Sequence, residues 1–335
     1  MRLTWGILSK YRNELYGFSI LWIMLFHGLE IKYTSFVKPF RFLESFIKHG
    51  NCGVEIFLFL SAICLYYSMK KDNSILNFYK KRLIRIYAPL LLICGVYWGY
   101  ANIIKQGNIG RFFSNITMHS FWGGNDKQVW FIALILVLYI IYPFIYKLLE
   151  RDECGWYIAA LILLVYAWCY FHNIMWHKHY MATEIALTRI PVFLLGCYVS
   201  KLVYEDRDIK PTMIIGIVCF LVAGLLYYEL HPFSLVKSYR TPYLFVGPSI
   251  AVCCAYLLGV LKKRWLNKAL TFFGSISLEL YLSHIILRKF FMVSDYYIKT
   301  KVNHNYYNYV WFVVIGAIII SYVVNWLIKR LECSD

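Results

Sequence analysis

Long apolar runs, separated by short polar and basic segments, occupy nearly the whole chain. A helix that crosses a bilayer needs about 20 mostly apolar residues. Ten runs approach this length: 15–31, 53–69, 84–104, 129–147, 156–171, 185–204, 212–230, 243–261, 270–292 and 308–328. The pattern predicts an all-α fold, a polytopic membrane helical bundle of about ten transmembrane helices. The longer connections, which we expect to be loops, are 32–52, 105–128, 172–184 and 293–307.

Composition supports a membrane protein. Of the 335 residues, 60% are hydrophobic and only 16% are charged, whereas soluble domains carry roughly 25% charged residues. No linker, low-complexity tract or repeat divides the sequence, so we expect a single domain over 1–335. The cysteines form no CxxC pair, and we predict neither a disulfide framework nor a metal site.

The formal net charge of +17 has a topological explanation. The basic residues lie between the apolar runs, where they set orientation and face anionic lipid, so the bilayer is the expected partner and nucleic acid is not. Their distribution favours a multi-pass protein of the plasma (inner) membrane with both termini cytoplasmic. The most basic segment on that side is 70–85, which contains Lys70, Lys71, Lys80, Lys81, Arg82 and Arg85.

His27 is the leading candidate for chemistry. It ends the run LYGFSILWIMLFH in the first predicted span, about 18 Å along the helix at about 1.5 Å per residue. An ionisable side chain inside a membrane is costly and indicates function, and histidine suits acid–base catalysis near neutral pH. Glu30 follows one turn later and could orient the ring. The alternative is a buried histidine that only bonds a neighbouring helix.

Arg82 and Arg85, in FYKKRLIRIYAP, share one helical face where the third span enters the membrane. Arginine forks bind phosphate groups in this arrangement, so the pair could hold a phosphorylated ligand from the cytoplasm. The alternative is ordinary anchoring of the span by positive charge.

Other polar residues within the spans form two groups. Glu184 and Arg189 could pair with each other or with other helices, whereas Glu279 and His284 face different sides of one helix. Both groups could instead be polar contacts that hold helices together. Trp130 stands at a span end, where it could belong to an aromatic girdle or contact a substrate.

Taken in order, several blocks resemble the acyltransferase-3 family of integral membrane O-acyltransferases over residues 12 to about 290. The blocks are LWIMLFH with His27, GVEIFLFLSAICL with Ser61, RLIRIYAP with Arg82 and Arg85, VWFIALILVLYIIYP with Trp130, RIPVFLLG with Arg189, and SLELYLSH with His284.

The resemblance implies acyl transfer from cytoplasmic acyl-CoA, usually acetyl-CoA, to a hydroxyl of a carbohydrate or lipid-linked glycan, with no permanently bound cofactor. It carries the essential histidine of the family onto His27 and donor-binding arginines onto Arg82 and Arg85. Two positions depart from the pattern: Tyr16 replaces an arginine, and Ser61 is followed by alanine instead of glycine. Arg12, one turn before Tyr16, could supply the missing charge.

We therefore predict a membrane O-acetyltransferase in which His27 either takes a proton from the acceptor hydroxyl or carries the acyl group. Glu30 would orient His27, and acyl-CoA would contact Arg82, Arg85, Arg12 and Tyr16. The expected substrate-lining residues are Ser61, Trp130, Glu184, Arg189, Glu279 and His284. The rival interpretations are a glycan or lipid transporter or flippase, and a scaffold or sensor that has lost activity.

Overall fold

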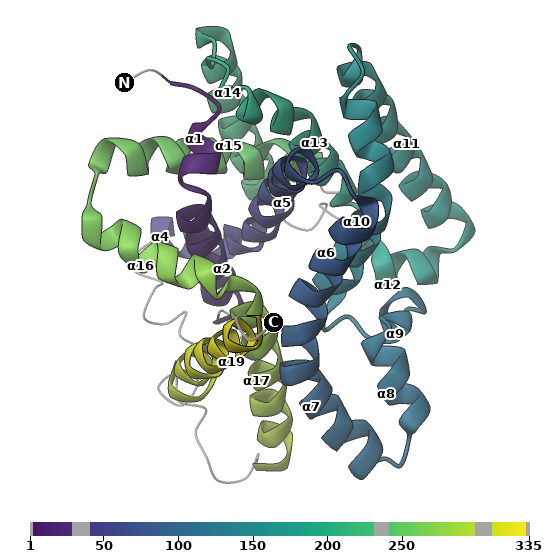
Figure 1. Cartoon of the computed structure of the whole chain (residues 1–335). Helices are drawn as coiled ribbons and strands as arrows, with labels where there is room; N and C mark the ends of the chain where they lie inside the picture. The colour runs from purple at the N-terminus through teal and green to yellow at the C-terminus, as the bar shows by residue number, and fades with distance from the viewer. Residues whose placement is uncertain (1–2, 29–40, 231–240, 299–309, 333–335) are drawn as a thin grey trace.

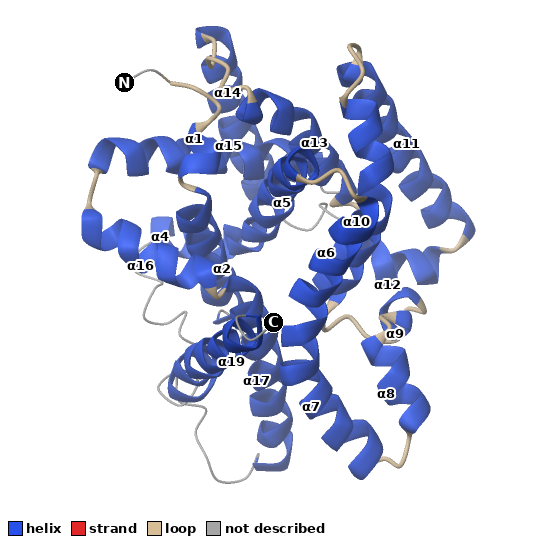
Figure 2. Ribbon diagram, in the orientation of Figure 1, coloured by secondary structure: helices blue, strands red, loops and turns tan. Residues whose placement is uncertain are grey.

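The computed structural model describes residues 3–28, 41–230, 241–298 and 310–332, and these residues fold into helices (Figures 1 and 2). Within these ranges the β-type pairing is limited to one isolated bridge between Thr4 and Asp208. In chain order the elements are α1 (Ile7–Lys10), α2 (Arg12–Gly28), α4 (Arg41–Lys48), η1 (His49–Cys52), α5 (Gly53–Lys71), α6 (Ile75–Leu90), η2 (Leu91–Gly95), α7 (Val96–Trp98), η3 (Gly99–Ile104), α8 (Ile109–Ile116), α9 (His119–Trp122), α10 (Trp130–Leu149), α11 (Cys154–Met175), α12 (His177–Leu187), α13 (Ile190–Tyr204), α14 (Pro211–Leu230), α15 (Thr241–Leu261), α16 (Arg264–Ser275), α17 (Ser277–Ile298), η4 (Val310–Ile315) and α19 (Gly316–Glu332).

Most of the predicted spans are helices long and apolar enough to cross a membrane. In the described part of the chain seven helices meet this test: Leu43–Lys71, Ile75–Ile104, Trp130–Leu149, Cys154–Met175, His177–Tyr204, Thr241–Leu261 and Trp311–Leu331. The bent pair α16–α17 raises the number to eight. The first and seventh predicted spans are also helical, as α2 and α14. The membrane bundle is confirmed, and about ten is an approximate count.

Some connections differ from expectation. The segment 172–184 is helical, not a loop, because α11 runs on to Met175 and α12 begins at His177. Likewise, α8 and α9 lie within 105–128. These stretches keep enough apolar residues to pack against the bundle, and this packing stabilises helices that a hydropathy pattern alone leaves out.

The helix α5 lies at the centre of the bundle and α11 at its edge (Figure 1). In the span Leu43–Lys71, 72% of the most apolar window is buried, against 17% for Cys154–Met175. Residues of α5 contribute to both large apolar clusters of the core. Side chains that α5 directs inward therefore lie between the other helices.

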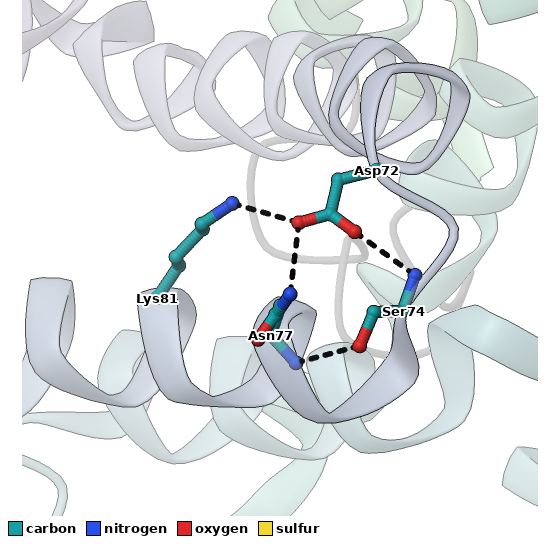
Figure 3. A network of polar contacts seen from close by, with 4 residues as sticks. All are labelled: Asp72, Ser74, Asn77 and Lys81. Atoms are coloured by element: carbon teal, nitrogen blue, oxygen red, sulfur yellow. Dashed lines mark hydrogen bonds and ion pairs between the residues drawn. The ribbon is translucent and has the colours of Figure 1, made fainter.

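A tight polar turn joins α5 to α6 (Figure 3). The Asp72 carboxylate accepts hydrogen bonds from Lys81 Nζ at 3.0 Å and from the Ser74 backbone N–H at 3.1 Å. The Ser74 hydroxyl caps α6 by accepting from the Asn77 N–H at 3.3 Å. These bonds, led by the one from Lys81, hold the pKa of Asp72 below its usual value. The turn fixes where α6 begins, and with it the position of the two arginines that follow.

The predicted span 270–292 is broken. The helices α16 and α17 meet at Ile276 with a bend of 68°. The Ser275 hydroxyl bonds back to the Phe272 carbonyl at 2.7 Å, which ends α16 locally. The helix α16 then lies against α2 (Figure 1), where Gly274 touches the backbone of Asn13 and Gly17 touches the backbone of Leu270.

Candidate active site

His27 lies in the last turn of α2 and contacts His284 of α17. His27 Nδ1 is 3.0 Å from His284 Nε2, and the two rings stack with centroids 5.2 Å apart. On its other side, His284 Nδ1 is 2.8 Å from the carbonyl oxygen of Leu280. His284 is only 1% exposed, so this chain of bonds is enclosed by the bundle.

This arrangement assigns the protons on both rings. A carbonyl oxygen can only accept, so His284 Nδ1 carries the hydrogen that bonds Leu280. In a neutral imidazole the other nitrogen is then an acceptor, and His27 Nδ1 must donate to it. The lone pair of His27 is therefore on Nε2. Nothing in this chain of bonds engages Nε2, which leaves it available for chemistry.

Two cavities lie near this pair. The first, the arginine cavity, has a volume of about 410 Å³ and is lined by Arg12, Tyr16, Ser61, Arg82 and Arg85, among others. The second, the histidine cavity, has a volume of about 400 Å³ and contains His27 with Trp130, Arg189 and several cations.

Three residues close to the histidine pair separate the two cavities. Ile23, Val54 and Tyr281 line both of them. Ile23 lies one turn before His27 on α2, and Tyr281 lies one turn before His284 on α17. The two cavities are therefore neighbours, and His27 belongs to the lining of the histidine cavity.

The arginine cavity brings together all four of the predicted donor-binding residues. Arg85 Nη1 pairs with Glu279 Oε1 at 3.1 Å, and Asn325 also donates to that carboxylate at 3.1 Å. The Arg85 side chain is still 43% exposed, so part of its guanidinium remains accessible. Arg82 lies over the Phe78 and Tyr139 rings, at 5.6 Å and 6.0 Å from their centroids.

Tyr16 and Arg12 share this cavity. The Tyr16 ring stacks on Phe57 with centroids 5.2 Å apart, and its hydroxyl is 3.5 Å from Cys64 Sγ. Arg12 Nη1 donates to the same sulfur at 3.9 Å. Arg12 thus places a cation in the cavity from one turn before Tyr16, the position at which the sequence departs from the family pattern.

Arg189 forms a buried ion pair with Glu55, a residue that was not singled out from the sequence. Its Nε is 2.8 Å from Glu55 Oε1, with the two side chains 3% and 0% exposed. The guanidinium also lies 4.7 Å from the Trp130 ring centroid. Glu184, which the sequence offered as a possible partner of Arg189, is buried but lines neither cavity. The signal that could have identified Glu55 is its position as the lone carboxylate in the apolar run GVEIFLFL.

Three further cations were not singled out from the sequence. Lys127, Arg288 and Lys289 line the histidine cavity. Arg288 and Lys289 follow His284 at the end of an apolar run, and only the fold brings Lys127 beside them. The predicted role of Glu30 concerns a position outside the described residues.

Other histidines form a separate pair. His172 Nε2 lies 2.9 Å from His179 Nδ1, and His179 Nε2 lies 2.7 Å from the Trp122 carbonyl oxygen. Across the described ranges, no group of three or more His, Cys, Asp or Glu side chains is arranged to hold a metal ion.

The bundle and its apolar spans define a multi-pass membrane protein. The family model described as an acyltransferase domain matches residues 15–330, nearly the whole chain. The protein therefore belongs to the acyltransferase-3 family and is a membrane acyltransferase. Neither the search of curated proteins nor the search of solved structures gave a match.

Proposed function

We propose that the protein is an O-acyltransferase that moves an acyl group, normally acetyl, from cytoplasmic acyl-CoA to a hydroxyl of a cell-surface polysaccharide, glycolipid or glycan precursor. The observation that carries the proposal is the position of His27, which carries its lone pair on Nε2 and lines one of two neighbouring cavities that both have cationic residues in their linings. We place the protein in the plasma membrane with both termini in the cytoplasm, because the basic segment 70–85 favours that side.

The donor occupies the arginine cavity in this proposal. Arg82, Arg85 and Ile86 of α6 line it, and most of the basic segment 70–85 belongs to this helix. Arg82, Arg85 and Arg12 supply the planar donors that pair with phosphate oxygens. With the phosphates held there, the thioester extends toward Ile23 and Tyr281, beside the histidine pair.

The acceptor approaches from the histidine cavity. His27 Nε2 takes the proton of the hydroxyl as its oxygen attacks the thioester carbonyl, so that a C–O bond forms and the C–S bond breaks. The departing thiolate then recovers the proton from the imidazolium. A histidine base contributes about 10²–10⁴-fold, and the remainder comes from holding the two reactants together. In the alternative mechanism, His27 Nε2 itself attacks the thioester carbonyl, so that a C–N bond forms as the C–S bond breaks, and the acceptor hydroxyl then displaces the acyl group from the ring.

His27→Ala tests the proposal. The purified protein in lipid nanodiscs, supplied with acetyl-CoA and a glycan acceptor, is assayed for free CoA and for acylated product by mass spectrometry. We expect His27→Ala to lose at least about 10²-fold in transfer rate. The matched control is His119→Ala, since His119 is exposed and lines neither cavity.

The proposed enzymatic function would be rejected if the His27→Ala protein, folded and inserted in the membrane, transferred the acyl group as fast as the wild type. A glycan or lipid flippase, the alternative, would show unchanged acylation and reduced export. Mass spectrometry of surface glycans from cells with and without the protein identifies the acceptor and the acyl group, because one acyl group changes the mass of the product.

A further inference from the structure

The wall between the two cavities is built from the side chains of Ile23 on α2, Val54 on α5 and Tyr281 on α17. They are 2%, 7% and 6% exposed. Among the residues that the structure describes, these are the ones common to both linings. The wall therefore decides what fits between a molecule in one cavity and a molecule in the other.

The aliphatic part of the wall lies where two helices touch. Gly53 directly precedes Val54, and a Cβ added to Gly53 would lie 2.9 Å from Cγ1 of Ile23 and 2.7 Å from the carbonyl oxygen of Ser19. Both distances are too short for an added carbon atom, so α2 and α5 are in close contact here. The helices leave little room for Ile23 and Val54 to move apart.

Aromatic packing holds the third side of the wall. The Tyr281 ring lies edge-on against the rings of Phe131 and His284, with centroids 5.4 Å and 5.9 Å apart. A well-packed interior responds to the insertion of even one methylene group. The wall is therefore a constriction whose width depends on the size of its side chains.

The proposed reaction directs the acyl chain toward this wall. The carbon under attack is bonded to the sulfur of the donor, the attacking oxygen of the acceptor, the carbonyl oxygen and the acyl chain. With the donor in the arginine cavity and the acceptor in the histidine cavity, the sulfur and the attacking oxygen point into opposite cavities. A tetrahedral carbon directs its remaining substituents sideways from the line between those two, which is toward the side chains that separate the cavities.

We infer that Ile23 and Val54 set the length of the acyl group and restrict the donor to short chains such as acetyl. The inference rests on the proposed function, from which it takes the position of the reacting carbon. An acetyl methyl fits against the packed side chains, whereas each further methylene has to displace one of them. An apolar site discriminates by about 10–200-fold for one methylene.

Changing the width of the wall tests the inference. The full-length protein in nanodiscs receives acetyl-CoA, propionyl-CoA or butyryl-CoA, and a surface-glycan extract from cells that lack the protein serves as acceptor. Mass spectrometry of the acylated product measures each transfer. In the wild type, kcat/KM should fall at least about 10-fold from acetyl to butyryl. Val54→Ala should raise the ratio of butyryl to acetyl transfer by at least about 10-fold, and Val54→Ile should lower the ratio of propionyl to acetyl transfer.

Val199→Ala is the matched control. Val199 belongs to α13, is 6% exposed and lines neither cavity. Both alanine variants remove the same atoms from a buried position, but only Val54→Ala should change the preference among acyl groups. Ile23→Val is a milder change that should raise the ratio of propionyl to acetyl transfer, and it decides the matter if thermal unfolding shows that Val54→Ala does not fold.

The outcomes separate this inference from the proposed function. The inference is overturned, and acyl transfer stands, if the wild type uses butyryl-CoA as well as acetyl-CoA. The same holds if the wall variants keep the wild-type ratios, or if Val199→Ala changes the ratio equally. If Val54→Ala changes the ratio but His27→Ala transfers acetyl as fast as the wild type, the wall contacts the acyl group and the proposed role of His27 fails. If the wild type transfers none of the three acyl groups, both proposals are rejected.

Discussion

His284 is a positioning residue for His27 at the scale of single side chains. Its Nε2 fixes which nitrogen of His27 carries the proton, and the Leu280 carbonyl fixes His284 in turn. Outer partners of this kind, when removed, typically cost a functional histidine about 10–100-fold. The contribution of His284 is therefore smaller than that of His27 itself, and it concerns orientation and tautomer.

We predict that His284→Ala lowers kcat by about 10–100-fold and leaves the KM for acetyl-CoA unchanged. His284→Gln should recover part of this loss, because its amide oxygen can still accept from His27 Nδ1. Steady-state kinetics with both substrates measure the two effects. A merely structural histidine would give the opposite pattern, in which both variants lose thermal stability together and glutamine rescues nothing.

The sequence could supply His27 but not its partner. A histidine inside an apolar run stands out in any hydropathy plot, whereas His27 and His284 lie 257 positions apart and meet only in the fold. Glu30 was predicted to orient the ring because it is near in sequence, and its placement is outside the described residues. In the structure, His284 contacts His27 Nδ1. The same limitation hid Glu55 as the partner of Arg189.

At the scale of elements, the crossing of α2 and α16 shapes the arginine cavity. A Cβ at Gly274 would overlap the Asn13 carbonyl oxygen, and one at Gly17 would overlap that of Leu270. Both obstacles are backbone atoms, which cannot swing aside as a side chain can. Arg12, Tyr16 and Gly274 all line the cavity, so the spacing of the two helices sets the distance between its walls.

We predict that Gly274→Ala forces the helices apart, costing about 1–3 kcal/mol of stability and raising the KM for acetyl-CoA. Gly216→Ala is the matched control: it also lies inside a helix, but nothing lies within 4 Å of its added Cβ. The control should be neutral or gain about 0.4–1 kcal/mol. Thermal unfolding in detergent and donor kinetics check both, and equal behaviour of the two variants would contradict the close crossing.

Hydropathy predicted where helices run but not how they turn. Each predicted span is mainly helical where the structure describes it, because apolar length is what the bilayer demands. Hydropathy did not predict the bend of 68° at Ile276, because α16 and α17 are both apolar enough to form one continuous run in the sequence. Direction depends on contacts such as those of Gly274 with α2, which are non-local. The helices within 172–184 were not predicted either, because non-local packing also stabilises them.

For the molecule as a whole, the central fact is that two neighbouring cavities with charged residues in their linings lie inside an apolar bundle. Membrane bundles tolerate such polar interiors only where charges are paired or face water-filled space. Arg189 and Glu55 supply one such pair, from the junction before α13 and from α5, beside the histidine cavity. The pair ties α5 to the start of α13 beside the histidine cavity.

We predict that Glu55→Gln destabilises the protein by about 3–5 kcal/mol, because it leaves the Arg189 guanidinium buried without its carboxylate. The double variant Glu55→Gln, Arg189→Gln should be more stable than the single one, since no uncompensated charge remains. Thermal unfolding of the wild type, both single variants and the double variant, in one detergent, gives the coupling energy between the two side chains. A coupling near zero would mean that the pair contributes nothing to the bundle. A large coupling, with acyl transfer restored in the double variant, would show that it is neutrality of the bundle interior, and not the guanidinium itself, that the chemistry at His27 requires.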